Sequence, residues 1–131
     1  MCGIVGIYFK KKKLHNKLGK YLSGMLDNMS SRGPDSAGFA IYNNDTKKFY
    51  KYSLCINDKS IINEFEVDIK NKFKDLTIKS VSDHLVIQTL SSPKTVIPYI
   101  KKKYDNILIV GYGKSIEIFK QVGNPKEIVK K

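Results

Sequence analysis

The segment from Arg32 to Gly38 constrains the fold of this chain more than any other. It reads Arg-Gly-Pro-Asp-Ser-Ala-Gly, so that two glycines, a proline and an aspartate fall within seven residues. Residues of these types favour tight turns and interrupt helices and central strands. Apolar residues at helical spacing precede the segment, and an apolar run follows it. We therefore predict a tight connection from a helix to a strand.

Arg32 is unusual for this chain because the 24 Lys and Arg residues include only this one arginine. The planar guanidinium of arginine makes fixed, bidentate hydrogen bonds that lysine cannot make. The placement of Arg32 beside a glycine turn indicates a geometric role. An ordinary structural turn is the alternative interpretation.

Cys2 is the second feature with chemical meaning, in the opening Met1-Cys2-Gly3-Ile4-Val5-Gly6-Ile7. Removal of Met1 would leave a terminal cysteine with both a thiol and a free α-amine. The thiolate is a strong nucleophile, and an α-amine with a pKa of about 7.7–8.0 is partly a free base at neutral pH. One residue would then hold both nucleophile and base. The alternative is a small cysteine packed in the core.

Together, the Cys2-Gly3-Ile4-Val5-Gly6 start and the Arg32–Gly38 turn resemble the class II glutamine amidotransferases, which are N-terminal-nucleophile (Ntn) hydrolases. The segment 22–30 is similar to the first helix of that family. The nearest likeness is to the amidotransferase subunits of glutamate-synthase-like and N-methylglutamate-synthase-like enzymes. The strong motifs cover residues 1 to about 44, and a weaker likeness continues through 111–115 to the C-terminus.

This resemblance implies an α+β fold, an αββα sandwich of two antiparallel sheets flanked by helices, of which residues 1–131 would be the N-terminal part. It implies glutamine as substrate, with Cys2 as nucleophile and Arg32, Gly33 and Asp35 in the substrate pocket. It implies neither a metal nor a cofactor. Ammonia released from glutamine would pass to a synthase partner.

The chain departs from the family pattern after the first turn. Family members hold the substrate carboxylate with an arginine in a His-Thr-Arg motif and build the oxyanion hole with an Asn-Gly pair. This sequence has no arginine after Arg32 and no Asn-Gly pair. Loss of one oxyanion donor alone costs on the order of a hundredfold to a thousandfold in rate. We expect one of three situations: a second chain completes the site, the gene is truncated, or the protein is an inactive relative kept for binding or assembly.

Composition excludes several other functions. The net charge of +12 comes from lysines scattered along the chain, and arginine, the usual reader of base edges, is nearly absent, so we expect no specific nucleic-acid partner. No stretch approaches the roughly 20 apolar residues of a membrane span. The basic run 10–13 follows the apolar start, unlike a signal peptide. We expect a cytoplasmic protein in which Cys55 is a packed residue and not half of a disulfide.

Local patterns predict the order of the elements. We expect strands at 2–9 (buried on both faces), 38–42, 49–56, within 76–90, at 106–110 and at 116–119, with 38–42 and 49–56 forming a hairpin. We expect helices at 14–31 with a Leu–Met stripe in the core, within 57–75, from Pro93 to about Tyr104, and at 126–131. Residues 111–115 should form a plain turn. A catalytic His84–Asp83 pair is not expected, because neighbouring residues of a strand point to opposite faces.

Overall fold

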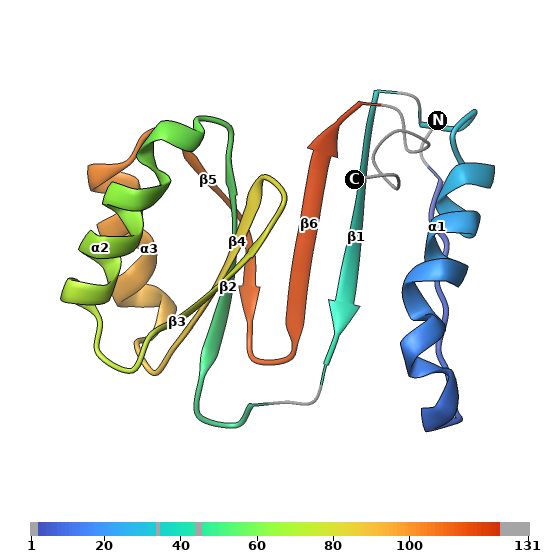
Figure 1. Ribbon diagram of the computed structural model, residues 1–131, viewed down its shortest axis with the longest axis horizontal. Coiled ribbons are helices and arrows are strands. Elements are labelled where there is room, and N and C mark those ends of the chain that lie inside the picture. The colour runs from blue at the N-terminus through green and yellow to red at the C-terminus, as the bar shows by residue number, and fades with distance from the viewer. Residues whose placement is uncertain (1–2, 34, 44–45, 124–131) are drawn as a thin grey trace. The chain divides into compact units, whose positions relative to one another are not determined.

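The computed structural model describes residues 3–33, 35–43 and 46–123, and it is an α+β structure (Figure 1). Its helices are α1 (Leu18–Asn28), α2 (Ile62–Lys72) and α3 (Pro93–Lys103), with short 3₁₀ helices at Lys12–Lys17 and Lys59–Ile61. Its strands are β1 (Ser36–Tyr42), β2 (Tyr50–Ile56), β3 (Thr77–Val81), β4 (His84–Thr89), β5 (Ile107–Gly113) and β6 (Ile116–Val122). The chain divides into one unit of residues 1–38 with 120–131 and another of residues 39–119. No helix in the described ranges is both long and apolar enough to cross a membrane.

A four-stranded sheet with the order β3-β4-β2-β5 forms the centre of the unit 39–119. All its neighbouring strands are antiparallel. Helix α2 connects β2 to β3 across β4, and helix α3 connects β4 to β5 across β2. Two interleaved βαβ crossovers of this kind make a split βαβ, or βαββαβ, arrangement. Residues 50–113 therefore form a structural module that lies, along the sequence, between β1 and β6. These two strands pair with each other in a separate two-stranded sheet.

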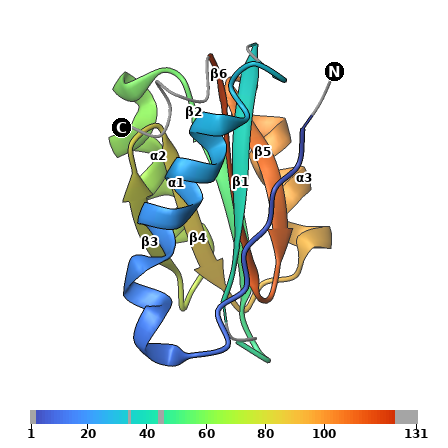
Figure 2. The ribbon, with the colours of Figure 1, turned by 90° about the vertical axis from the view of Figure 1, so that its right-hand side faces the viewer.

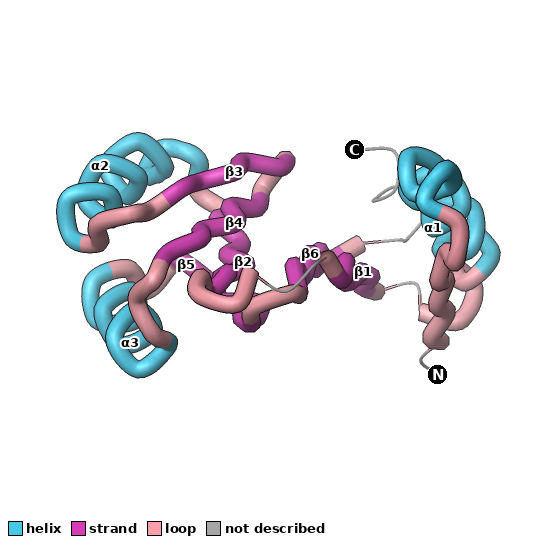
Figure 3. Tube along the Cα trace, turned by 90° about the horizontal axis from the view of Figure 1, so that it is seen from below, coloured by secondary structure: helices cyan, strands magenta, loops and turns pink. Residues whose placement is uncertain are grey.

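The hydrophobic core of this module lies between the sheet and the two helices, which cover the same face of the sheet (Figures 1 and 3). Full burial of a large apolar side chain stabilises a fold by about 1.5–3 kcal/mol. The core residues come from β2, α2, β4, α3, β5 and the residues just after the two helices: Tyr52, Leu54, Ile56, Phe65, Ile69, Phe73, Leu85, Ile87, Val96, Ile100, Tyr104 and Ile107. This core explains why 50–113 can form a structural unit.

The two helices of the module are explained by local sequence features, namely apolar residues at helical spacing and, for α3, a proline in its first turn. Phe65 and Ile69, four residues apart on α2, are fully buried. Helix α3 begins at Pro93, whose fixed φ suits the first turn of a helix, and buries Val96 and Ile100. The predicted helices within 57–75 and from Pro93 are confirmed, as are strands within 76–90, at 106–110 and at 116–119.

The face of β2 that points away from the helices is also buried, because β6 lies against it. Lys51 pairs with Glu117 at 2.6 Å between Nζ and Oε1, and the backbone N–H of Ile118 donates to Ser53 Oγ at 2.8 Å. Strand β2 is thus covered on both faces, with β4 and β5 as its neighbours. The predicted hairpin of 38–42 with 49–56 is wrong, because β2 has no free edge left and β1 pairs with β6.

Gly111 and Gly113 belong to strand β5, so the predicted turn over 111–115 is wrong except at its last two residues. A Cβ atom on Gly111 would lie 2.4 Å from Ile118 Cδ1, and one on Gly113 would lie 2.7 Å from Ile116 Cγ2. Both distances are shorter than van der Waals contact. These glycines therefore make room for the isoleucines of β6.

Residues 3–9 run alongside α1 in the unit that contains residues 1–38 (Figure 2). The Phe9 ring meets the edge of Tyr21, with the centroids 5.6 Å apart. The predicted doubly buried strand at 2–9 is wrong for the described residues 3–9, which join no described strand and leave Ile4 and Tyr8 exposed. Within its own unit the segment packs against the first helical region, through Gly3 and Phe9, instead of pairing as a strand.

Helix α1 also differs from the expectation. The predicted helix 14–31 is a 3₁₀ turn at Lys12–Lys17 followed by an α-helix that ends at Asn28. No residue of α1 is fully buried, so its Leu–Met stripe is half-buried and not core. The helix expected at 126–131 lies outside the described residues.

Candidate functional site

The two sequence motifs meet where Gly3 contacts the end of the first helical region. A Cβ atom on Gly3 would lie 2.0 Å from Met29 Cε, 3.5 Å from Arg32 Cβ and 3.6 Å from Arg32 Cδ. The backbone of Gly3 therefore packs directly against the side chain of Arg32. Cys2, the residue bonded to Gly3, lies outside the described residues.

The turn that carries Arg32 is held by backbone hydrogen bonds. The N–H of Arg32 donates to the carbonyl oxygen of Met29 at 2.9 Å, and the carbonyl oxygen of Asp35 accepts from the N–H of Gly123 at 2.9 Å. The Arg32 and Asp35 residues are exposed, and Gly33 is half-buried. The guanidinium of Arg32 forms no ion pair with another side chain of the described ranges. The structure thus brings Gly3, Arg32 and the turn together, with the charged groups accessible to solvent.

Gly3 offers a direct test of this contact. We expect Gly3→Val to slow modification of Cys2 by a glutamine-like electrophile about tenfold to a hundredfold, because a displacement of about 1 Å at a reacting group has effects of that size. Gly6→Val is the matched control, since a Cβ atom on Gly6 meets nothing within 4 Å. The rates are measured by timed quenching and mass spectrometry. Equal rates for the two variants would show that the Gly3 contact has no bearing on Cys2.

Cys55 is a poor candidate for a second nucleophile. It is buried, and its thiol contacts Asn57 Oδ1 at 3.7 Å. Burial first, and the nearby charge of Asp83 second, raise the pKa of the Cys55 thiol. The thiol therefore stays protonated and inert at neutral pH. The interpretation of Cys55 as a packed residue is confirmed.

His84 lies directly across from Cys55 in the pairing of β2 with β4, and sequence analysis missed this neighbour. The two residues lie far apart in the chain, so only the register of the sheet reveals them. The imidazole is buried, with its ring centroid 5.5 Å from that of Phe119. Because the Cys55 thiol beside it is protonated, this pair is a packing feature of the sheet.

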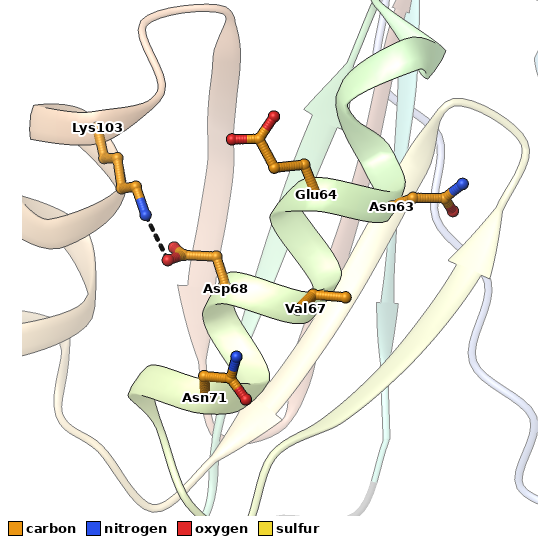
Figure 4. A pocket seen from close by; sticks show the side chains of 6 residues that line it. All are labelled: Asn63, Glu64, Val67, Asp68, Asn71 and Lys103. Atoms are coloured by element: carbon orange, nitrogen blue, oxygen red, sulfur yellow. Dashed lines mark hydrogen bonds and ion pairs between the residues drawn. The ribbon is translucent and has the colours of Figure 1, made fainter.

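A shallow hollow of about 500 Å³ lies over the outer surface of α2. Its lining residues are Asn63, Glu64, Val67, Asp68, Asn71 and Lys103. In Figure 4 the Asp68 carboxylate points to Lys103, whereas Asn63 and Val67 lie on the opposite flank of the helix. The polar groups do not converge on one point, so the hollow shows no catalytic arrangement.

Asp68, on α2, instead bonds to two residues of α3. Its carboxylate accepts hydrogen bonds from Tyr99 Oη at 2.8 Å and from Lys103 Nζ. Burial acts to raise the pKa of Asp68, but the hydrogen bonds from Lys103 and Tyr99 outweigh it, so that the net pKa is lowered. The carboxylate is therefore charged at neutral pH.

We expect Tyr99→Phe to lower the free energy of unfolding by about 1.5–3 kcal/mol, because it removes one hydrogen bond to a charged acceptor. The measurement is urea denaturation. Tyr21→Phe is the control, since Tyr21 is half-exposed and its ring contact with Phe9 remains. A loss of stability no greater than in the control would contradict the role of this bond.

Metal ligands do not cluster in the described ranges, where no group of three or more His, Cys, Asp or Glu side chains could hold an ion. No family model matches the chain, and no solved structure matches it.

Two curated relatives do match. The chain is 36% identical over 134 residues to "Glutamine amidotransferase-like protein GlxB" of Rhizobium meliloti, and 33% identical over 139 residues to "Putative glutamine amidotransferase" of Methanothermobacter thermautotrophicus. Each match covers 98% of this chain but only 44% and 45% of the respective relatives. The chain thus spans a little under half the length of these relatives. Both relatives support the relationship to glutamine amidotransferases that the Cys2 and Arg32 motifs indicate.

Proposed function

We propose that this chain carries the nucleophile-bearing part of a class II glutamine amidotransferase of the Ntn-hydrolase type. The observation that supports this most is the packing of Gly3 against the Arg32 side chain, because it joins the two motifs on which the family resemblance rests. The names of the two relatives support glutamine amidotransferase activity in general. In this proposal residues 1–131 are the N-terminal part of the amidotransferase domain, and the protein acts in the cytoplasm.

The proposed reaction begins after removal of Met1. The α-amine of Cys2 accepts the thiol proton, and the thiolate attacks the side-chain amide carbon of glutamine. The amine then returns the proton to the departing nitrogen, so that ammonia leaves and a glutamyl thioester forms. Water hydrolyses the thioester to glutamate and regenerates the thiol. No metal or cofactor takes part in this sequence.

Arg32, Gly33 and Asp35 form one wall of the proposed substrate pocket. Arg32 lies beside Gly3 and has no ion-pair partner among the described side chains. Its guanidinium can therefore make the directional hydrogen bonds that orient either the Cys2 terminus or the substrate. Gly33 and Asp35 hold the turn, since Asp35 is bonded through its carbonyl oxygen to Gly123.

A second arginine for the substrate carboxylate and an oxyanion-hole Asn-Gly pair are absent from the sequence. The relatives are more than twice as long as their match to this chain. We propose that a polypeptide equivalent to the remaining part of the relatives supplies these groups and delivers ammonia to a synthase.

An inactive binding or assembly relative is the second candidate, and the missing arginine and Asn-Gly pair favour it. One experiment separates the two. The protein is made with a removable N-terminal extension whose cleavage leaves Cys2 as the first residue, and glutamate release from glutamine is measured before and after cleavage in the presence of the unmatched part of the Rhizobium meliloti relative. We expect release only after cleavage. Equal release before and after would contradict the role of the α-amine, and no release in either state would favour the inactive relative.

A further inference from the structure

Met29 lies at the end of the first helical region, where backbone hydrogen bonds hold it on both sides. It is the residue that caps α1, and its N–H donates to the carbonyl oxygen of Leu26 at 3.0 Å. Its own carbonyl oxygen accepts from the N–H of Arg32 at 2.9 Å. The half-buried Met29 side chain therefore extends from a backbone that is fixed in the same turn as Arg32.

The terminal methyl of this side chain occupies the space where a side chain at position 3 would begin. A Cβ atom on Gly3 would lie 2.0 Å from Met29 Cε, whereas carbon atoms in contact are about 3.5–4.0 Å apart. The same point lies 3.5 Å from Arg32 Cβ and 3.6 Å from Arg32 Cδ, which are ordinary contact distances. The Met29 methyl is thus closer to this side of Gly3 than the Arg32 stem is. All three residues belong to one structural unit, 1–38 with 120–131.

A contact at Gly3 acts on Cys2 through a single peptide unit. The peptide unit is planar and its two Cα atoms are 3.8 Å apart, so a displaced Gly3 backbone carries the Cys2 backbone with it. A displacement of about 1 Å at a reacting group can reduce a rate about a hundredfold. The side chains that pack against Gly3 therefore limit the error in the position of Cys2.

We propose that Met29 is a positioning residue for the amidotransferase reaction, in which its terminal methyl packs against Gly3 and keeps Cys2 where it can attack the glutamine amide. The inference rests on the proposed function, since Met29 acts through the nucleophile of that reaction. Met29 takes no part in forming or breaking bonds. Its loss should therefore slow reactions that need Cys2 in its place and leave the intrinsic reactivity of the thiol unchanged.

The alternative is that Met29 only packs the end of the helix, and leucine distinguishes the two roles. Methionine has an unbranched side chain that ends in Cε, one atom further from the backbone than the end of leucine. Met29→Leu keeps an apolar side chain of similar volume, a change that protein cores tolerate, but it withdraws the methyl from Gly3. Leucine should therefore serve for packing and fail for positioning.

Two reactions of the Cys2 thiol measure this difference. The native protein and its variants are treated with the glutamine analogue 6-diazo-5-oxo-norleucine or, separately, with iodoacetamide, and timed peptide mapping gives each rate at Cys2. For Met29→Leu and Met29→Ala we expect labelling by the analogue to be at least about tenfold slower, because it alone needs Cys2 in its reacting position. Alkylation by iodoacetamide should be unchanged. Met25→Ala is the matched control, since Met25 is half-buried one turn earlier on α1, and it should change neither rate.

A compensating pair tests the contact itself. Gly3→Ala adds a Cβ atom in the space of Met29 Cε, so it should also slow labelling by the analogue. Gly3→Ala combined with Met29→Ala removes this clash and fills the space that the methyl leaves. The combined variant should therefore react faster than either single variant, a non-additive result that is expected of residues in contact.

Urea denaturation establishes which variants are folded, and if Met29→Ala is not, Met29→Leu gives the result. Labelling of Met29→Leu at the wild-type rate would overturn the inference, and so would equal slowing of labelling and alkylation. A combined variant that reacts more slowly than both single variants would exclude the contact as the cause. Failure of the analogue to label Cys2 in the wild type would contradict the proposed function and this inference with it, so the two failures are distinguishable.

Discussion

Replacement of Lys51 by methionine is expected to lower the free energy of unfolding by about 3–5 kcal/mol, because it leaves the buried carboxylate of Glu117 without its cation. Lys51 and Glu117 are each 7% exposed, and their charged atoms lie 2.6 Å apart. The pair connects β2 to β6. Urea denaturation at pH 7 measures the loss.

Two further variants separate this effect from a general cost of removing lysine. Lys51→Met combined with Glu117→Leu should recover most of the lost stability, because an apolar pair of similar volume commonly replaces a buried ion pair without net cost. Lys59→Met should change stability by at most about 1 kcal/mol, since Lys59 is 70% exposed in its pair with Asp83. A double variant as unstable as Lys51→Met would contradict the account of an uncompensated charge.

The same pair predicts a direction of pH dependence. Burial acts to raise the pKa of Glu117, but the hydrogen bond and charge of Lys51 outweigh it and the net pKa is lowered from 4.5. A lowered folded-state pKa contributes stability above the ordinary pKa, and this contribution is lost as the pH falls through the folded value. The wild type should therefore lose more stability below about pH 4.5 than the double variant.

Replacement of Cys2 by alanine is expected to reduce glutamate release at least about a thousandfold, because the reaction we propose has no other nucleophile. The assay uses the chain with the completing polypeptide and with Met1 removed. Cys55→Ala is the matched control, since the Cys55 thiol is buried and its pKa is raised. It should retain activity.

Cys2→Ser sharpens the test. A hydroxyl has the same position as the thiol but is a much weaker nucleophile at neutral pH. We expect this variant to bind glutamine and to release little glutamate. Equal activity of Cys2→Ala and the wild type would exclude Cys2 as the nucleophile.

Local structure in this chain could be predicted where one short pattern decides it. Pro93 and the apolar residues Val96 and Ile100 identify α3, because a proline start and helical spacing need no information from elsewhere. The strand after Asn106 is similarly visible as an apolar run, and it is β5. The burial of Cys55 follows from its apolar surroundings.

Strand partners could not be predicted in this way, because they depend on contacts between distant residues. Lys51 reads as an exposed charge in the sequence, and only its pairing with Glu117, 66 residues away, explains its burial. The order β3-β4-β2-β5 likewise depends on crossovers that carry each strand past its neighbour. Local patterns therefore pair 38–42 with 49–56, the nearest strand, whereas β1 pairs with β6.

The candidate site, too, could be predicted from the sequence only in part. The residue types and spacing identify Cys2 and Arg32 as chemically unusual, and the resemblance assigns them roles. The contact of Gly3 with Arg32 Cβ and Cδ could not be seen in the sequence, since it depends on the path of residues 3–9 along α1. The exposed face of that segment was also missed, because its apolar composition is typical of a buried strand.

The most direct test of the proposed function is covalent labelling of Cys2 in the native protein. The protein is treated with the glutamine analogue 6-diazo-5-oxo-norleucine, and intact-mass analysis and peptide mapping locate the adduct. We predict loss of Met1 and a single adduct on Cys2, with none on Cys55. Retained Met1, or an unmodified Cys2 whose thiol still reacts with a simple alkylating reagent, would contradict a formed glutamine site.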